Sequence, residues 1–114
     1  MTGFRLDVDG RGGGRAVLRV AGEVDVYTAP QVREQIRDLA AKGTVHLIAD
    51  LSQVEFIDSS GLGALIGGLR RVREDNGALV LVIPTRRILR VFQLTGLTKA
   101  FAIYDNLDDA LSAG

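Results

Sequence analysis

The stretch Thr44–Gly63, TVHLIADLSQVEFIDSSGLG, decides the fold that we predict for this chain. Its first part, Thr44–Leu51, is almost continuously apolar, which is typical of a central strand covered on both faces. Ser52–Ile57 is expected to connect this strand to Asp58–Gly63, which opens a helix running to about Asp75. That helix is predicted because apolar residues recur at helical spacing, at Leu62, Leu65, Ile66, Leu69 and Val72.

Upstream of this stretch the pattern predicts two strands and a helix. Phe4–Val8 alternates apolar and polar residues, as a half-buried strand does. A glycine-rich turn separates it from Arg15–Ala21, which we expect to pair with it as a hairpin. Gly22–Tyr27 is predicted to be a loop, and Thr28–Lys42 a helix. Thr28 is the expected cap of that helix, because Gln31 follows at capping-box spacing.

Downstream of the stretch, strands and helices continue to alternate. Ala78–Ile83 is predicted to be a buried strand, followed by a helix from Pro84–Thr85 to Thr95–Gly96. Phe101–Tyr104 is a short final strand, and Asp105 caps a last helix. The alternation predicts an α/β domain with a mixed, mostly parallel β-sheet of about five strands and four α-helices. Seven apolar residues are expected in its core, namely Leu47, Ile48, Leu65, Leu69, Leu79, Leu81 and Phe92.

The composition excludes several function classes. The chain has 114 residues, with 14 Lys and Arg against 14 Asp and Glu, so it lacks the basic excess of a nucleic-acid binder. It has 0 cysteines and 1 histidine, which argues against thiolate chemistry and multi-histidine metal sites. No apolar run approaches about 20 residues, the length that spans a membrane. The N-terminus lacks the apolar stretch of a signal peptide, and a cytoplasmic location is the expectation.

Two polar segments are expected to meet at one edge of the sheet. Gly22–Asp25 follows one strand and Asp58–Gly63 follows the next, and parallel strands place their carboxyl ends together. Asp58 and the serines after it have the residue types of a helix cap. Two glycines in the first turn weaken a helix and leave backbone that another molecule can approach. Capping and partner binding both remain possible from the residues alone.

Other candidate sites have a stronger structural interpretation. The glycines of Gly61–Gly67 lie within a helix and no acid follows at the dinucleotide-binding distance, so close helix packing is favoured. Glu23 and Asp25 lack a histidine or metal partner and are interpreted as solvated loop acids or a docking surface. His46 lies in a strand that reads as buried, and a hydrogen-bonded structural role is expected. The arginines of Arg70–Arg73 and Arg86–Arg90 are interpreted as solvated helix faces.

Two motifs together identify a family resemblance. Asp58-Ser59-Ser60-Gly61-Leu62-Gly63 after an apolar strand, with Gly22-Glu23-Val24-Asp25 upstream, resembles the STAS domain family. Within that family the chain is most similar to bacterial anti-sigma factor antagonists, also called anti-anti-sigma factors. Phe56-Ile57 and Val91–Leu97 match the pattern as well. The resemblance runs from about Phe4 to Leu111 and implies a single STAS domain over residues 1–114.

The resemblance implies a partner-switching regulator rather than an enzyme. The unphosphorylated antagonist binds an anti-sigma factor, usually with serine kinase activity, and thereby frees a sigma factor. Phosphorylation of the first serine after the acid, here Ser59, ends the binding, and a phosphatase resets it. The implied partner-binding residues are Glu23, Asp25, Asp58, Ser60, Gly61 and Leu62. ATP belongs to the kinase, so the chain itself needs no cofactor or metal, and no nucleic acid or membrane contact is implied.

Two alternatives follow from other members of the family. One is a small-ligand or nucleotide-binding module, and the other is a STAS scaffold in a transport or stress-signalling assembly. The serine at position 59 favours the switch over the scaffold.

Overall fold

The computed structural model describes residues 3–113 and consists of five strands and four α-helices. The strands are β1 (Arg5–Gly12), β2 (Arg15–Val24), β3 (His46–Ile57), β4 (Ala78–Val82) and β5 (Ile103–Tyr104). The helices are α1 (Ala29–Ala41), α2 (Ser59–Glu74), α3 (Arg86–Leu94) and α4 (Leu107–Ala113), with a short 3₁₀ turn at Leu97–Lys99. This order confirms the predicted α/β architecture.

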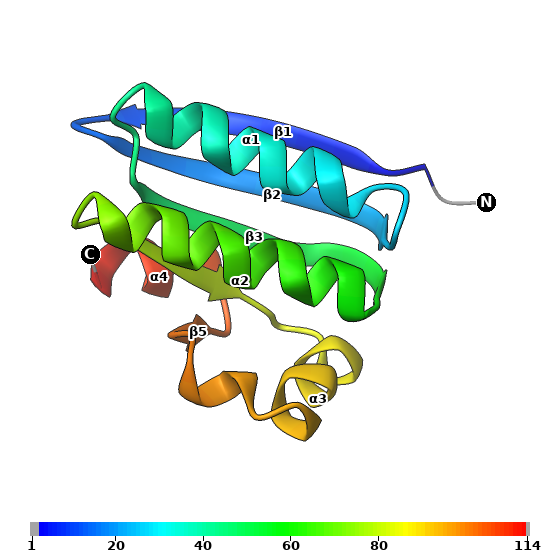
Figure 1. Cartoon of the computed structure of the whole chain (residues 1–114). Helices are drawn as coiled ribbons and strands as arrows, with labels where there is room; N and C mark the ends of the chain where they lie inside the picture. The colour runs from blue at the N-terminus through cyan, green and yellow to red at the C-terminus, as the bar shows by residue number, and fades with distance from the viewer. Residues whose placement is uncertain (1–2, 114) are drawn as a thin grey trace.

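The five strands form one sheet in the order β1-β2-β3-β4-β5. β1 pairs with β2 antiparallel, and the remaining pairs are parallel. Helices α1 and α2 lie side by side on one face of the sheet, whereas the short α4 lies on the other face (Figure 1). The main core fills the space between α1, α2 and the sheet, where Leu18, Ile36, Leu47 and Leu65 are fully buried.

Both central strands are longer than the sequence predicts. β2 continues to Val24 and β3 to Ile57, so Gly22, Glu23 and the whole of Ser52–Ile57 belong to strands rather than to connections. The prediction was wrong because the pairing of β2 with β3 persists through two register shifts, where the alternation of side chains breaks. Gly22 occupies the second shift with a φ of 90°, a conformation that glycine adopts without strain.

Six of the seven predicted core residues are buried, and Ile48 is the exception. Ile48 is half-buried because its side of β3 faces away from α1 and α2. The same alternation corrects the prediction for His46, which is exposed rather than buried, and for Ala78 and Val80, which are not fully covered. The strand was expected to be covered on both faces, but the short α4 covers only part of the second face in the described residues.

The start of α1 also differs from the prediction. The Thr28 side chain makes no capping hydrogen bond to the helix. Its hydroxyl instead donates to the backbone carbonyl of Glu23 at 2.8 Å and accepts from the backbone N–H of Asp25 at 2.9 Å. The Asp25 carboxylate accepts from the backbone N–H groups of Tyr27 and Thr28, at 2.9 and 3.1 Å. The Asp25 carboxylate therefore stabilises the turn into α1, and the Thr28 hydroxyl connects this turn to the end of β2.

Candidate functional site

The carboxyl ends of β2 and β3 meet at one edge of the sheet, at the right-hand end of Figure 1. Val24 is paired with Ile57, and Glu23 with Phe56. The backbone N–H of Asp58 then donates to the carbonyl of Val24 at 3.2 Å. Two segments separated by more than thirty residues in the chain are thus joined directly by the sheet, which confirms that the two predicted polar segments converge.

Asp58 is the N-cap of α2. Its side-chain oxygen Oδ1 accepts from the backbone N–H groups of Ser60 at 2.9 Å and Gly61 at 3.1 Å, and its carbonyl accepts from Leu62 at 2.9 Å. These bonds satisfy donors that a helix N-terminus otherwise leaves without partners. The capping interpretation of Asp58 is therefore confirmed, and the carboxylate is committed to holding the start of α2.

Ser59 is the first residue of α2 and its side chain is exposed. Within residues 3–113 its hydroxyl makes no hydrogen bond, whereas the neighbouring Ser60 is half-buried. The hydrogen bonds of the Asp58 cap hold the backbone next to Ser59, and the Ser59 side chain lies exposed to solvent. Of the two serines, Ser59 is the one that an approaching molecule reaches first.

Gly61 and Leu62 face the interior rather than the surface. Both are buried, and a Cβ added to Gly61 would lie 2.7 Å from Ile57 Cγ1 and 2.8 Å from the carbonyl oxygen of Val24. The expectation that Gly61 leaves backbone open to a partner is therefore wrong, because its bare face is covered by β2 and β3. Because Gly61 has no side chain, α2 can begin in close contact with the sheet directly after Ser59.

The two acids beside this helix start have different surroundings. Glu23 is exposed at the end of β2, and its side chain makes no hydrogen bond within the described part of the chain. Asp25 is half-buried and accepts the hydrogen bonds of the turn into α1. The interpretation of both as solvated loop acids is thus wrong for Asp25, which has a structural role, while Glu23 remains free to meet a partner.

Sequence reasoning did not single out the apolar side chains exposed at this edge. Tyr27 is 84% exposed and Val26 60% exposed in the turn after β2, and Phe56 is 47% exposed at the end of β3. Large exposed apolar groups at a polar edge are typical of interaction sites. The available signal was the Val26-Tyr27 pair, which stands between the turn residues Asp25 and Thr28 where no core-facing strand continues.

The groups exposed at this edge are a serine hydroxyl, a carboxylate and apolar side chains. No group of three or more His, Cys, Asp or Glu side chains that could hold a metal ion occurs among the described residues. None of the helices in residues 3–113 is long and apolar enough to cross a membrane. A rigidly capped serine hydroxyl, a free carboxylate and three apolar side chains form a surface that another protein can contact.

The fold is that of a small α/β domain with exposed polar and apolar groups at one edge, and the comparisons with known proteins show its family. The STAS domain family model matches residues 5–110, so the chain belongs to the STAS domain family. The chain is 39% identical over 84 residues to the anti-sigma-B factor antagonist of Listeria monocytogenes, covering 74% of each chain. It is 40% identical over 80 residues to the Bacillus subtilis protein of the same name, covering 70% of this chain and 72% of that protein.

A solved structure is similar over nearly the whole chain. The crystal structure of an anti-sigma factor antagonist from Mycobacterium paratuberculosis superposes with a TM-score of 0.87 at 35% identity. The match covers 97% of this chain and 93% of that one. The resemblance predicted from the motifs at residues 22–25 and 58–63 is thereby confirmed at the level of the family and the fold.

Proposed function

We propose that this chain is an anti-sigma factor antagonist whose unphosphorylated form binds an anti-sigma factor with serine kinase activity. Binding frees a sigma factor, phosphorylation of Ser59 ends the binding, and a phosphatase restores it. The observation that carries the proposal is the exposed Ser59 hydroxyl on the capped start of α2, beside exposed apolar groups. The names of the Listeria, Bacillus and Mycobacterium relatives support the antagonist role.

The proposed docking surface surrounds Ser59. Glu23, Asp58 and Ser60 supply its polar part, and Tyr27 and Phe56 supply its apolar part. Aromatic side chains commonly dominate the affinity of an interface when a partner covers them. Asp25, Gly61 and Leu62 contribute by shaping this surface from inside, because their own groups are used by the turn into α1 and by the core.

The same geometry explains how a phosphate on Ser59 would end the binding. A phosphate adds about −1.5 to −2 charges at neutral pH. A helix N-terminus normally attracts such a charge through its backbone N–H groups, but those of Ser60 and Gly61 already donate to Asp58. The phosphate would therefore stand next to a carboxylate with two of the local donors occupied. We expect release to follow from the cost of covering these two like charges together in the interface, without any refolding of the domain.

Phosphorylation is tested by incubating the chain with its anti-sigma factor and ATP, followed by peptide mass spectrometry. We expect one phosphate, on Ser59, and none in the Ser59→Ala variant. Ser112→Ala is the matched control, because Ser112 is also an exposed serine but lies on α4. Phosphate on Ser60 alone, or an anti-sigma factor that binds the chain and transfers no phosphate, would contradict the proposed switch.

A further inference from the structure

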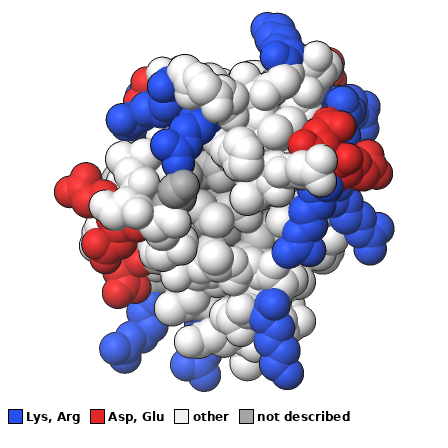
Figure 2. Space-filling model, turned by 90° about the vertical axis from the view of Figure 1, so that its left-hand side faces the viewer, with Lys and Arg blue, Asp and Glu red and all other residues white. Residues whose placement is uncertain are grey.

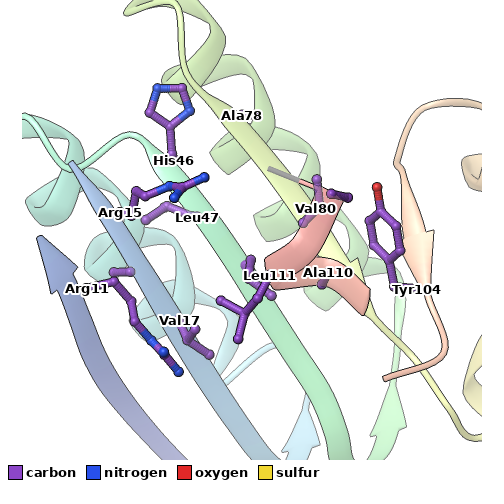
Figure 3. Close-up of a pocket in the computed structure, with 13 residues that line it drawn as sticks. Arg11, Arg15, Val17, His46, Leu47, Ala78, Val80, Tyr104, Ala110 and Leu111 are labelled. Atoms are coloured by element: carbon purple, nitrogen blue, oxygen red, sulfur yellow. The ribbon is translucent and has the colours of Figure 1, made fainter. Parts of the chain in front are cut away.

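A cavity of about 560 Å³ lies on the face of the sheet opposite α1 and α2 (Figure 3). Its floor is a row of apolar side chains from three adjacent strands, in which Val17 is paired with Ile48 and Ile48 with Val80. Leu111 of α4 forms a side wall. Cavities of about 300–1,000 Å³ with mostly apolar walls are typical of small-molecule sites.

The cavity exists because this face of the sheet is only partly covered. α4 has 7 residues, and of these Ala110 is the one that is buried. Parallel sheets usually carry helices on both faces, but here α4 packs on the second face mainly against β3, β4 and β5. Val17 is fully buried yet lies outside the main core, on the face away from α1 and α2. The apolar surface that stays accessible in the cavity is therefore that of the half-buried Ile48, Val80 and Leu111, with Val17 packed beneath it.

Basic groups line the amino-terminal end of this cavity. Arg15 is paired with His46, and His46 with Ala78, in the row of residues next to the floor. Figure 3 shows the Arg15 and His46 side chains beside each other at this end. Both are exposed, and in residues 3–113 neither forms an ion pair or a side-chain hydrogen bond. Two donor groups therefore stand at the end of an apolar floor without a partner.

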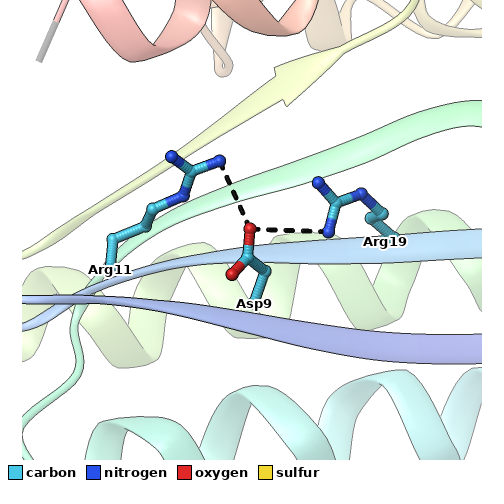
Figure 4. Close-up of polar contacts among 3 residues, drawn as sticks. All are labelled: Asp9, Arg11 and Arg19. Atoms are coloured by element: carbon cyan, nitrogen blue, oxygen red, sulfur yellow. Dashed lines mark ion pairs between the residues drawn. The ribbon is translucent and has the colours of Figure 1, made fainter.

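The remaining charges near the cavity leave this end positive. Arg11 also lines the cavity and forms an ion pair with Asp9 at 3.2 Å. The same Asp9 oxygen lies 3.6 Å from Arg19, so one carboxylate serves two arginines (Figure 4). Figure 2 shows basic and acidic side chains around the edge of this view and a largely uncharged middle, and no acidic residue is among the described residues that line the cavity. Among the described residues Arg15 forms no ion pair, and an anion bound there would supply the missing negative charge.

We propose that this cavity binds a small amphipathic carboxylate, with its alkyl chain against the half-buried Ile48, Val80 and Leu111 and its carboxylate at Arg15 and His46. A guanidinium matches a carboxylate with two parallel hydrogen bonds, and the imidazole adds a further donor. The site lies at the opposite end of β2 and β3 from Ser59, and the proposal is independent of the antagonist role. It assigns a second binding site to the domain, for a metabolite rather than a protein.

The test is a titration of the ¹⁵N-labelled full chain with octanoate, followed by NMR. We expect saturable shifts at Val17, Ile48, Val80 and Leu111. Acetate, which lacks the chain, and 1-octanol, which lacks the charge, are each expected to bind about tenfold more weakly, as is octanoate to Arg15→Gln. Arg5→Gln is the matched control, because Arg5 is an exposed arginine on the same face of the sheet but does not line the cavity.

A filling variant separates the cavity from the charge. Ala78→Phe adds a ring at an exposed strand position on the rim, and we expect it to abolish octanoate binding while the protein spectrum stays folded. Octanoate binding that is equal in wild type, Arg15→Gln and Ala78→Phe would overturn the proposal, as would no saturable shift. Binding to phosphatidylglycerol vesicles without binding of free octanoate would overturn it in favour of a membrane contact. A dimer that Ala78→Phe disrupts would assign the face to a second copy.

Discussion

The two ends of the β2–β3 pair differ in what their side chains do. At the carboxyl end, the carboxylates of Asp58 and Asp25 accept hydrogen bonds from the chain's own backbone N–H groups, and Gly61 packs closely against β2 and β3. At the amino end the backbone N–H groups of Val45 and His46 donate to the carbonyl of Gly14 at 3.1 and 3.0 Å, and the Arg15 and His46 side chains are exposed.

This difference indicates how one small sheet carries two kinds of recognition. The capped end is rigid and leaves few groups exposed, chiefly the Ser59 hydroxyl, Glu23 and the apolar side chains, which suits a protein partner that reads one chemical change. The amino end leaves Arg15 and His46 exposed beside an apolar floor, which suits a ligand that brings its own charge. At the first end, changes to exposed groups should weaken partner binding and changes to capping or buried groups should lower stability, whereas changes at the second end should affect neither.

The largest effect is expected from phosphorylation of Ser59. When a partner covers the phosphate together with the Asp58 carboxylate, water is removed from two like charges, which costs several kcal/mol, and this corresponds to a loss of about two to three decades in affinity for the anti-sigma factor. Calorimetric titration of the phosphorylated and unphosphorylated chains measures it. Ser59→Ala should bind as tightly as the unphosphorylated chain, and Ser59→Glu more weakly. Equal affinity of the two forms would show that the capped end does not carry the switch.

The second largest effect is expected from Gly61→Ala. The added methyl group would meet the Val24 carbonyl and the Ile57 side chain at less than 3.0 Å. Overpacking of this kind destabilises proteins by about 1–3 kcal/mol. Gly67→Ala is the control in the same helix, since its Cβ would lie 3.7 Å from Arg33 Nε and the change raises helix propensity. In urea unfolding, Gly61→Ala should lower the free energy of unfolding and Gly67→Ala should raise it. Equal stabilities would contradict the packing role of Gly61.

A smaller effect on binding is expected from Tyr27→Ala. The side chain is 84% exposed, so its removal should change the free energy of unfolding by less than about 0.5 kcal/mol. If a partner covers it, affinity for the anti-sigma factor should fall about tenfold. Leu94→Ala, which removes another side chain with 76% exposure from α3, is the matched control and should bind normally. Equal losses in both variants would indicate that the apolar contacts are not confined to the Ser59 edge.

Substitutions of Asp25 and Glu23 should differ in their effect on the free energy of unfolding, although both residues lie at the capped end. Asp25→Ala removes the acceptor of two backbone N–H groups at the turn into α1, and losing such a cap costs about 1 kcal/mol. Glu23→Ala removes an exposed side chain and should change stability by less than about 0.5 kcal/mol while weakening partner binding. Thermal melts and binding titrations on both proteins measure this. Equal melting temperatures would contradict the structural role of Asp25.

The smallest effect is expected at the amino end. His46→Asn changes an exposed side chain without a hydrogen bond in the described residues, so stability should move by less than about 0.5 kcal/mol. Affinity for the anti-sigma factor should be unchanged, because His46 begins β3 and Ser59 follows its far end. A large loss in either quantity would show that the two ends are coupled.

Much of this molecule could be predicted from its sequence, because periodicity and helix signals are local. The alternation of strands and helices, the cap at Asp58 and the convergence of residues 22–25 with 58–63 all follow from patterns within a few residues and from the rules of parallel pairing. The STAS resemblance rested on the same short segments.

The tertiary structure decided which face of each element is covered and where each strand ends. Ile48 and His46 read as buried, but their burial depends on how far the short α4 reaches across the second face. Gly61 read as open backbone, but its surroundings come from β2 and β3. These properties arise from contacts between segments distant in the chain, and such contacts determine burial, register shifts and cavities, whereas local periodicity determines only the elements that make them.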